Sequence, residues 1–440
     1  STGSSGQVNL NAAVGGANPL SSLTVTTGAL TSDAIKLNGA LTVNNSTTST
    51  ISGAITDGAS AANLVKAQNG ILTISGNNTF TGSTAVNAGT LKILNDDPTA
   101  YLAATSGITG SGSLTIESAG SDFSSAISTT KITGTFTDLT IGKSGNTQTI
   151  NLSNDIATTS DQRYNGPVIL SGGNRTLTAG TSSDNIFFES TVDSDGTARS
   201  LSVSAGTNSG GVITFTGAVG GNSELSGLTS DSKLFKAGSN ITLAGLLDVD
   251  IYSNSQSSNY GIAGGILDGS TSASFSKGGG SNRWLEVYGN NNYTGPTTVK
   301  AGYLRITNDS PHSFLNNTTF TGPGHLQIRP NSTNFGSVLA MSDINFTGTS
   351  IGRLYIGRSG TSTKLVLDED IDVNGQLHLY MPVELNGGDR DIKATNNNVT
   401  FYQTINSDGT QRALTVTNGT GDTTFSGAIG GSAPVKSLTI

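Results

Sequence analysis

Three aspartates at alternate positions, Asp368, Asp370 and Asp372, have the spacing that most readily suggests metal chemistry. Alternate residues of a β-strand point to the same side, so these carboxylates could share an outward face and bind Ca²⁺ together with backbone oxygens. The matching segment of an earlier repeat keeps only Asp155, and Gly375 comes too late for an EF-hand loop. We therefore favour a solvated acidic face and predict no metal and no cofactor, with Ca²⁺ as the alternative.

A second group of residues could bind sugars. Trp284 and Tyr288 share one face of the strand expected in "RWLEVYG", and Tyr293 follows closely. Aromatic rings stack on sugars, but they also fill corners and cores. The matching positions of the earlier repeat hold Ile71 and Ser75 instead. A packing role is the preferred interpretation, and glycan binding by Trp284, Tyr288 and Tyr293 is the alternative.

The sequence predicts no catalytic residue. Its three histidines, His312, His325 and His378, have no partner at ligand spacing, so we expect exposed structural roles for them. Absence of cysteine excludes a thiolate nucleophile and a cysteine-based zinc site. A serine nucleophile elbow, a P-loop and a Rossmann fingerprint are also missing. Tandem repeats offer many similar surfaces, whereas an enzyme needs one preorganised pocket.

Composition and charge narrow the choice of partners. Only 12% of the 440 residues are charged, against roughly 25% in an ordinary soluble protein. The formal net charge of −8 argues against nucleic acid, which needs a clustered basic face. No apolar run approaches the ~18 residues that would suggest a membrane-spanning helix. The uncharged polar side chains of serine, threonine and asparagine must therefore form most of the hydrated surface.

Long tandem repeats organise the chain. The segment "NNTFTGSTAVNAGTLKI" at 77–93 returns as "NNNYTGPTTVKAGYLRI" at 290–306, and "IGKSG" from Ile141 returns as "IGRSG" from Ile356. These matches predict a first repeat over 1–217, truncated at its start, and a second over 218–440, cut inside a unit at its end. We expect the sequence to be a window on a longer repetitive chain.

The local pattern predicts short β-strands that wind into coils. Segments such as "GILTISG", "GTLKILN" and "GQLHLYM" alternate apolar and polar residues and end at Gly, Asn, Asp or Ser. In 77–93, Phe80 and Val86 should point inward, Asn77 and Asn78 should take positive-φ turn positions, and Gly89 should form a corner. This is about one coil of a parallel β-solenoid, with ~20–25 residues per coil. One helical turn at most is expected, within residues 99–107.

The same residues carry a family resemblance. The segment from Gly70 to Ile93, and more loosely that from Arg283 to Ile306, resembles the autotransporter-associated β-strand repeat of bacterial surface passengers. The phrases "ITFTGAVGG" and "NITLAG" resemble filamentous-haemagglutinin-like exoproteins. The resemblance implies an all-β fold, a right-handed parallel β-helix continuous over the chain, located outside the bacterial cell.

Three functions compete for such a chain. The preferred one is a non-catalytic structural protein of the bacterial surface that forms a rod, a stalk or a self-assembling extracellular fibre. The alternative is an adhesin that binds glycans or other cells through a lateral face. A second alternative is a polysaccharide-cleaving β-helix or a phage tailspike. The expected partners are further copies or neighbouring repeats of the same chain, and extracellular glycans in the adhesin case.

Overall fold

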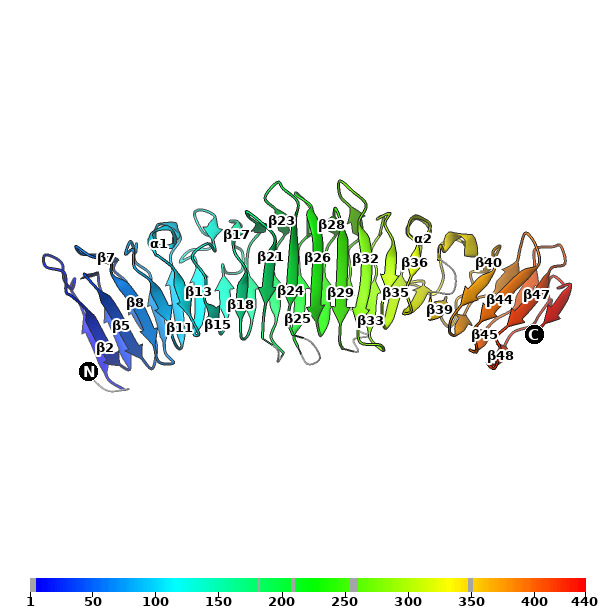
Figure 1. The fold of residues 1–440 in the computed structure, drawn as a ribbon, viewed down its shortest axis with the longest axis horizontal. Helices are drawn as coiled ribbons and strands as arrows, with labels where there is room; N and C mark the ends of the chain where they lie inside the picture. Colours follow the sequence, from blue (N-terminus) through cyan, green and yellow to red (C-terminus); the bar gives the residue numbers. More distant parts are fainter. Residues whose placement is uncertain (1–4, 181–182, 207–209, 254–259, 347–350) are drawn as a thin grey trace. The chain divides into compact units, whose positions relative to one another are not determined.

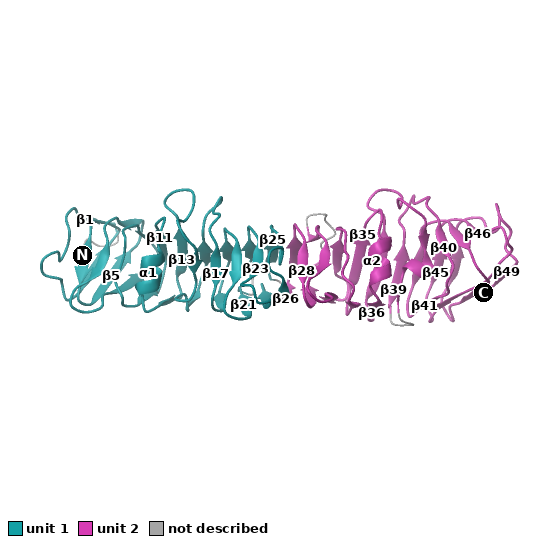
Figure 2. Ribbon diagram, turned by 90° about the horizontal axis from the view of Figure 1, so that it is seen from above, with its two compact units in different colours: residues 1–225 teal, residues 226–440 magenta. Residues whose placement is uncertain are grey.

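The computed structural model describes residues 5–180, 183–206, 210–253, 260–346 and 351–440. These residues form short parallel β-strands with very little helix, in agreement with the predicted all-β solenoid. They fall into two compact units, Ser1–Leu225 and Ser226–Ile440 (Figure 2). The repeat boundary between residues 217 and 218 rests on sequence similarity alone and stays a prediction.

In unit 1 each strand pairs in parallel with a strand of a neighbouring coil, so that successive coils lie side by side (Figure 1). The long sheet consists of β1 (Gln7–Leu10), β3 (Ala29–Ser32), β6 (Ser49–Ile51), β9 (Ile71–Ile74), β11 (Thr90–Leu94), β13 (Ser113–Glu117), β16 (Leu139–Ile141), β19 (Gln162–Tyr164), β22 (Ile186–Phe188) and β25 (Val212–Phe215).

The other strands of unit 1 form the remaining sides of the same coils. Early coils use β2 (Leu23–Thr27), β5 (Ala40–Asn45), β8 (Asn63–Ala67), β10 (Thr84–Val86) and β12 (Ile108–Gly110), with the pair β4 (Ile35–Leu37) and β7 (Ile55–Asp57). Later coils use β14 (Ile127–Ser128), β17 (Ile150–Leu152), β20 (Val168–Leu170) and β23 (Val192–Ser194), and β15 (Thr135–Phe136), β18 (Ile156–Thr158), β21 (Arg175–Thr178) and β24 (Arg199–Ser204).

Unit 2 repeats this plan. Its long sheet consists of β27 (Leu234–Ala237), β30 (Gly261–Ile262), β33 (Trp284–Val287), β35 (Tyr303–Thr307), β37 (His325–Arg329), β39 (Arg353–Ile356), β42 (Leu377–Leu379), β45 (Val399–Phe401) and β48 (Thr423–Phe425). A second side consists of β26 (Leu225–Ser232), β29 (Leu246–Ile251), β32 (Ser274–Gly279), β34 (Thr297–Val299) and β36 (Phe320–Thr321).

The remaining strands of unit 2 complete its coils. They are β28 (Ile241–Leu243) and β31 (Ile266–Asp268), then β38 (Leu339–Ala340), β40 (Leu365–Leu367), β43 (Val383–Leu385) and β46 (Ile405–Ser407), and finally β41 (Ile371–Val373), β44 (Arg390–Ala394), β47 (Ala413–Thr417) and β49 (Ser437–Thr439). Both units are thus made of the coils that the alternating sequence pattern predicts.

Each unit has a narrow apolar core built by residues that pair in register. In unit 1, Leu72 lies beside Leu91, and Leu91 beside Leu114. Leu285 and Leu304 are paired in the same way in unit 2. All five side chains are buried. A one-residue slip would move such a column to the solvent side, so the apolar pattern itself fixes the register.

The corners confirm one predicted turn and correct another. Gly89 has φ of +65°, as a corner residue should, and so does Gly302 in the second repeat at +67°. Neither Asn77 nor Asn78 has positive φ. Asn78 points inward, where its Oδ1 accepts the N–H of Ile55 at 2.9 Å. Its amide satisfies a buried backbone donor, so this asparagine braces the previous coil.

Three short helical elements interrupt the strands within the described residues: α1 (Thr99–Ala104), α2 (His312–Asn317) and the 3₁₀-helix η1 (Met341–Asp343). The first lies in the segment where one helical turn was expected, whereas α2 was not predicted. Among the described residues, no helix has both the length and the apolar character needed to cross a bilayer.

Candidate functional site

Aromatic and basic side chains gather on the outer side of one sheet in unit 2. The strands are β33, β35, β37, β39, β42 and β45, which pair in that order. Their inward residues are aliphatic or Phe401, so the alternate residues face outward. We call this surface the aromatic face, and its ring-bearing residues are Trp284, Tyr288, Tyr303, His325, Tyr355, His378, Tyr380 and Tyr402.

Rings at the start of the aromatic face contact one another from coil to coil. The ring centroids of Trp284 and Tyr303 are 3.9 Å apart, and those of Tyr303 and His325 are 4.4 Å apart. The guanidinium carbon of Arg305 lies 4.0 Å from the centre of the Trp284 ring, which is a cation–π distance. Arg353 extends the row, because its Nη1 donates to the Tyr303 hydroxyl at 2.8 Å.

A second group of rings continues this surface on β39, β42 and β45. Tyr355 and His378 are 4.6 Å apart at their centroids, and Tyr380 and Tyr402 stack nearly parallel at 4.2 Å. The Nδ1 atom of His378 is also 3.1 Å from the hydroxyl of Tyr402. Tyr402 is 38% exposed, so it is the most accessible large ring of this group.

The carboxylate of Glu286 on β33 holds two arginine side chains of the aromatic face in place. Glu286 Oε1 accepts from Thr307 at 2.6 Å and from Arg329 at 2.6 Å, and Arg305 lies 3.8 Å from Oε2. Burial alone would raise the pKa of Glu286, but hydrogen bonds from Thr307 and Tyr288 and the charges of Arg329 and Arg305 outweigh it and lower the pKa. Glu286 is therefore charged, and it positions both arginines.

Replacing Glu286 with glutamine should remove a pH-dependent part of the stability. The folded pKa lies below its ordinary value of 4.5, so protonation favours unfolding. This contribution is complete above that value and is lost as the pH falls through the folded pKa. Near neutral pH we expect E286Q to lower the free energy of unfolding by about 2 kcal/mol, the size of a charged hydrogen bond.

Urea unfolding at several pH values measures this effect. The difference between the native chain and E286Q should shrink as the solution becomes acidic, because the native carboxylate is then neutral as well. Lys92→Met is the control, since it removes a partly exposed ion pair with Glu117 in the long sheet of unit 1, which should contribute little to stability. An E286Q difference that stays constant with pH would contradict the assigned charge.

The histidines of the aromatic face are neutral near physiological pH. Burial lowers the pKa of His325 to about 4, with a further contribution from Arg353 and Lys277. Burial and Arg353 also lower the pKa of His378. Both side chains are half-buried in the stack rather than exposed as expected. In the described part of the chain, Nδ1 of His325 and Nε2 of His378 are buried without a hydrogen-bond partner, and neither neutral ring adds positive charge to this surface.

The aromatic face suits binding better than catalysis. Several ring faces are covered by neighbouring rings or by the Arg305 guanidinium, and Tyr402 keeps the most exposed ring of this surface. Such a surface can bind a polar polymer by hydrogen bonds and by edge contacts. The equivalent outer side of unit 1 carries Phe187, which Arg163 covers at 4.0 Å.

The comparisons with known proteins identify the repeats. Residues 64–93 and 285–306 match the passenger-associated transport repeat. The chain is a β-helical protein with autotransporter-associated repeats. A comparison with curated proteins and one with solved structures gave no match. The repeat and the fold together fit an extracellular or cell-surface β-helical protein.

The predicted sugar-binding residues lie in the second transport repeat or, for Trp284, directly before it, and they do not form one surface site. Trp284 and Tyr288 do lie on one outward face, at the two ends of β33. Tyr293 does not join them, because its side chain is fully buried and its hydroxyl is 2.6 Å from Thr297 Oγ1. It occupies the position of Phe80 in the first transport repeat, which is also buried. The inclusion of Tyr293 in a surface site is therefore corrected.

The three aspartates proposed for Ca²⁺ have separate partners. Asp368 accepts from Ser342 at 3.0 and 2.6 Å, and Asp370 accepts the N–H of Asp391 at 2.9 Å. Asp372 lies on β41, beyond a corner, with Lys393 at 3.9 Å. The bend between β40 and β41 removes the shared face that a straight strand would give. In the described ranges, no three acidic or histidine side chains cluster in a way that could hold a metal.

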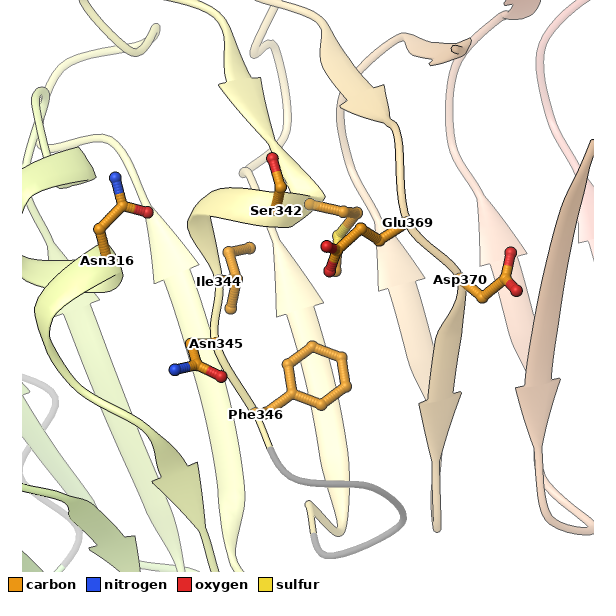
Figure 3. Close-up of a pocket in the computed structure, with 8 residues that line it drawn as sticks. Asn316, Ser342, Ile344, Asn345, Phe346, Glu369 and Asp370 are labelled. Atoms are coloured by element: carbon orange, nitrogen blue, oxygen red, sulfur yellow. The ribbon is translucent and has the colours of Figure 1, made fainter. Parts of the chain in front are cut away.

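A small polar pocket lies beside these aspartates (Figure 3). Its volume is about 250 Å³, and its lining consists of Asn316 from α2, residues Met341, Ser342, Ile344, Asn345 and Phe346 in and after η1, and Glu369 and Asp370 after β40. Figure 3 shows the carboxylates of Glu369 and Asp370 well separated and pointing to different sides. This arrangement does not place two carboxylates for joint acid–base chemistry.

Most of the aromatic face was missed by sequence reasoning. Tyr303, Tyr355, Tyr380 and Tyr402 were not singled out, and His325 was considered only as an isolated residue. The sequence does contain a pattern that could have identified them, because each of these rings alternates along its strand with apolar residues that point inward. Finding it requires the pairing of strands roughly one coil apart, which the structure supplies.

Proposed function

We propose that the chain is a structural, extended part of an extracellular bacterial surface protein. The observation that carries this proposal is the coil-by-coil pairing of strands, in which inward apolar residues of one coil pair with those of the next. Stability then comes from contacts between neighbouring coils, so length can change without loss of the fold. Self-association through further coils of the same kind is compatible with this role. The role requires no reaction, and it leaves room for a local activity on one coil.

Deleting one whole coil tests this proposal. Leu72 pairs with Leu91, so removing residues 72–90 lets Leu91 take the place of Leu72 and leaves all later strands in register. We expect the shortened chain to fold with native-like far-UV circular dichroism and with slightly lower stability. Removing residues 72–89 is the control, because the extra residue turns every inward side chain outward at the junction.

The two deletions give opposite expected results. The in-register chain should unfold in one clear transition, while the control should lose ordered structure near the junction and become sensitive to proteases. If both deletions unfolded the chain equally, the modular scaffold proposal would fail. If both folded equally well, the paired columns would not be what holds the coils together.

A second candidate function is adhesion to extracellular glycans through the aromatic face. It is favoured by the difference between the repeats: the inward columns are alike in both, but the ring-bearing outward residues concentrate in unit 2. Five of the ten tyrosines and the single tryptophan of the sequence lie on this face. A role in packing alone would not require this concentration, because the equivalent sheet of unit 1 carries mostly small or charged polar side chains, with Phe187 under Arg163.

Glycan-array binding with Tyr402→Ala measures the adhesin candidate. Tyr402 is accessible, and removal of an exposed aromatic contact should weaken binding by about 1 kcal/mol, or roughly fivefold in Kd. Phe187→Ala in unit 1 is the matched control and should leave binding unchanged. Binding that survives both substitutions, or that is lost equally in both, would contradict a site on the aromatic face.

A further inference from the structure

A serine, a histidine and an aspartate form a hydrogen-bonded chain away from the aromatic face. The hydroxyl of Ser337 is 2.8 Å from Nε2 of His312. The other ring nitrogen, Nδ1, is 2.9 Å from Oδ2 of Asp343. With the proton on Nδ1, the imidazole donates to the aspartate and accepts from the serine. This is the connectivity of an activated serine nucleophile, its general base and a group that orients the base.

The coil architecture brings these three residues together across 25 and 31 positions of sequence. His312 is the first residue of α2, Asp343 is the last residue of η1, and Ser337 lies in the loop before β38. The N–H of Ala340 donates to Asp343 Oδ2 at 2.8 Å, which fixes the carboxylate. His312 and Asp343 are partly buried, while Ser337 is exposed. The nucleophile is therefore accessible and its two partners are held.

Unit 1 contains the same local backbone without the same chemistry. The N–H of Gly336 donates to Asp309 O at 2.7 Å, just as that of Ser124 donates to Asp96 O at 2.7 Å. Ser125 therefore corresponds to Ser337.

The other two positions differ between the units. Thr99 begins α1 where His312 begins α2. A matching turn before Ile132 and Ile344 places Lys131 where Asp343 stands. The serine occurs in both repeats, whereas the base and the aspartate occur only in the second, so the local fold does not require them.

We propose that Ser337, His312 and Asp343 form a hydrolytic site for short-chain carboxylic esters. This goes beyond the structural role proposed above and does not depend on it. Ser337 Oγ attacks the ester carbonyl carbon while its proton passes to His312 Nε2. The carbonyl π electrons move onto oxygen and return as the alcohol leaves, taking the proton from His312. Water, deprotonated by His312, then releases the carboxylic acid and restores the serine.

The surroundings of Ser337 define the substrate class. The backbone N–H groups of Ser337 and Val338 donate to no other described residue, so they are available to the oxyanion that forms at the carbonyl. The side chain of Val338 is 44% exposed beside the nucleophile and offers apolar contact to a small acyl group. The accessible position of Ser337 suits an ester on a large or polymeric alcohol, and it lacks the enclosed surface that a long acyl chain would need.

Active-site labelling of the whole chain tests the proposal independently of any natural substrate. We expect a fluorophosphonate probe to modify Ser337, detected by peptide mass spectrometry, and 4-nitrophenyl acetate to be hydrolysed faster than the octanoate ester. Ser337→Ala and His312→Gln should abolish labelling and reduce kcat/KM at least ~100-fold. Ser125→Ala is the matched control and should behave like the native chain.

The Asp343→Asn variant tests whether Asp343 positions the histidine for the reaction or only stabilises the fold. Loss of the carboxylate should lower kcat at least ~100-fold because the histidine adopts the wrong tautomer, with little change in KM. Circular dichroism and thermal unfolding of each variant verify that it folds. The proposal is overturned if folded native chain leaves Ser337 unlabelled, if His312→Gln labels normally, or if Asp343→Asn retains native kcat.

Discussion

Replacing Phe188 with alanine is expected to lower the free energy of unfolding of unit 1 by about 3–5 kcal/mol. Phe188 is fully buried between Tyr164 and Phe215, with ring centroids 5.3 and 4.7 Å away. Its removal takes away buried apolar area and leaves a cavity between two rigid coils. Each coil is fixed by its own strand pairing, so the neighbours cannot collapse into the space.

Urea unfolding followed by circular dichroism measures this effect, with Phe187→Ala as the control. Phe187 is the adjacent residue in β22 and points outward under Arg163. Its removal should cost less than about 1 kcal/mol, the size of an exposed cation–π contact. Equal losses from the two substitutions would show that the inward column does not dominate the stability of this unit.

Replacing Gly375 with alanine is expected to destabilise unit 2 by about 3 kcal/mol or more, at the upper end of overpacking effects. A Cβ atom at this position would lie 1.5 Å from the backbone carbonyl oxygen of Gly352 in the previous coil. That oxygen cannot rotate away, because both coils are held by the pairing of β39 with β42. The corner must open, and the strand bonds next to it must lengthen or break.

Gly16→Ala provides the control for a general effect of removing glycine. No atom lies within 4 Å of a Cβ added there, so the substitution should be neutral or slightly stabilising. Hydrogen exchange localises the damage in Gly375→Ala, where amides of β39 and β42 should lose protection first. Uniform protection in that variant would mean that the corner tolerates the methyl group and that coil spacing is softer than the contact implies.

The stacking of coils limits the positions at which functional side chains can be introduced. Inward positions and corner glycines are constrained by the neighbouring coil, so a change there weakens the stack. Outward side chains and corner loops are free to differ from one repeat to the next. The aromatic face and the cluster of Ser337, His312 and Asp343 both lie at such positions, and both are present in unit 2 without an equivalent in unit 1.

Several features of the fold were predictable because they depend on local rules. Alternation of apolar and polar residues predicted the strands, and Phe80 points inward as expected. The positive φ of Gly89 follows from its freedom of backbone conformation. The expectation for Asn78 was wrong because its partner, the N–H of Ile55, belongs to another coil. Sequence rules for asparagine describe turns within a segment, not bonds between segments.

By itself the sequence determined that this protein is a parallel β-solenoid, because a side-chain period of two and repeated corner residues are local properties of the chain. Only the tertiary structure decided which side chains meet. In the structure, Tyr293 is buried, and a corner of the coil lies between Asp368 and Asp372. The hydroxyl of Ser337 meets the ring of His312 from another part of the chain. The physical reason is that neighbours in a solenoid lie one coil apart, and coil length varies: Leu72 pairs 19 residues ahead with Leu91, but Ile186 pairs 27 residues ahead with Ile213.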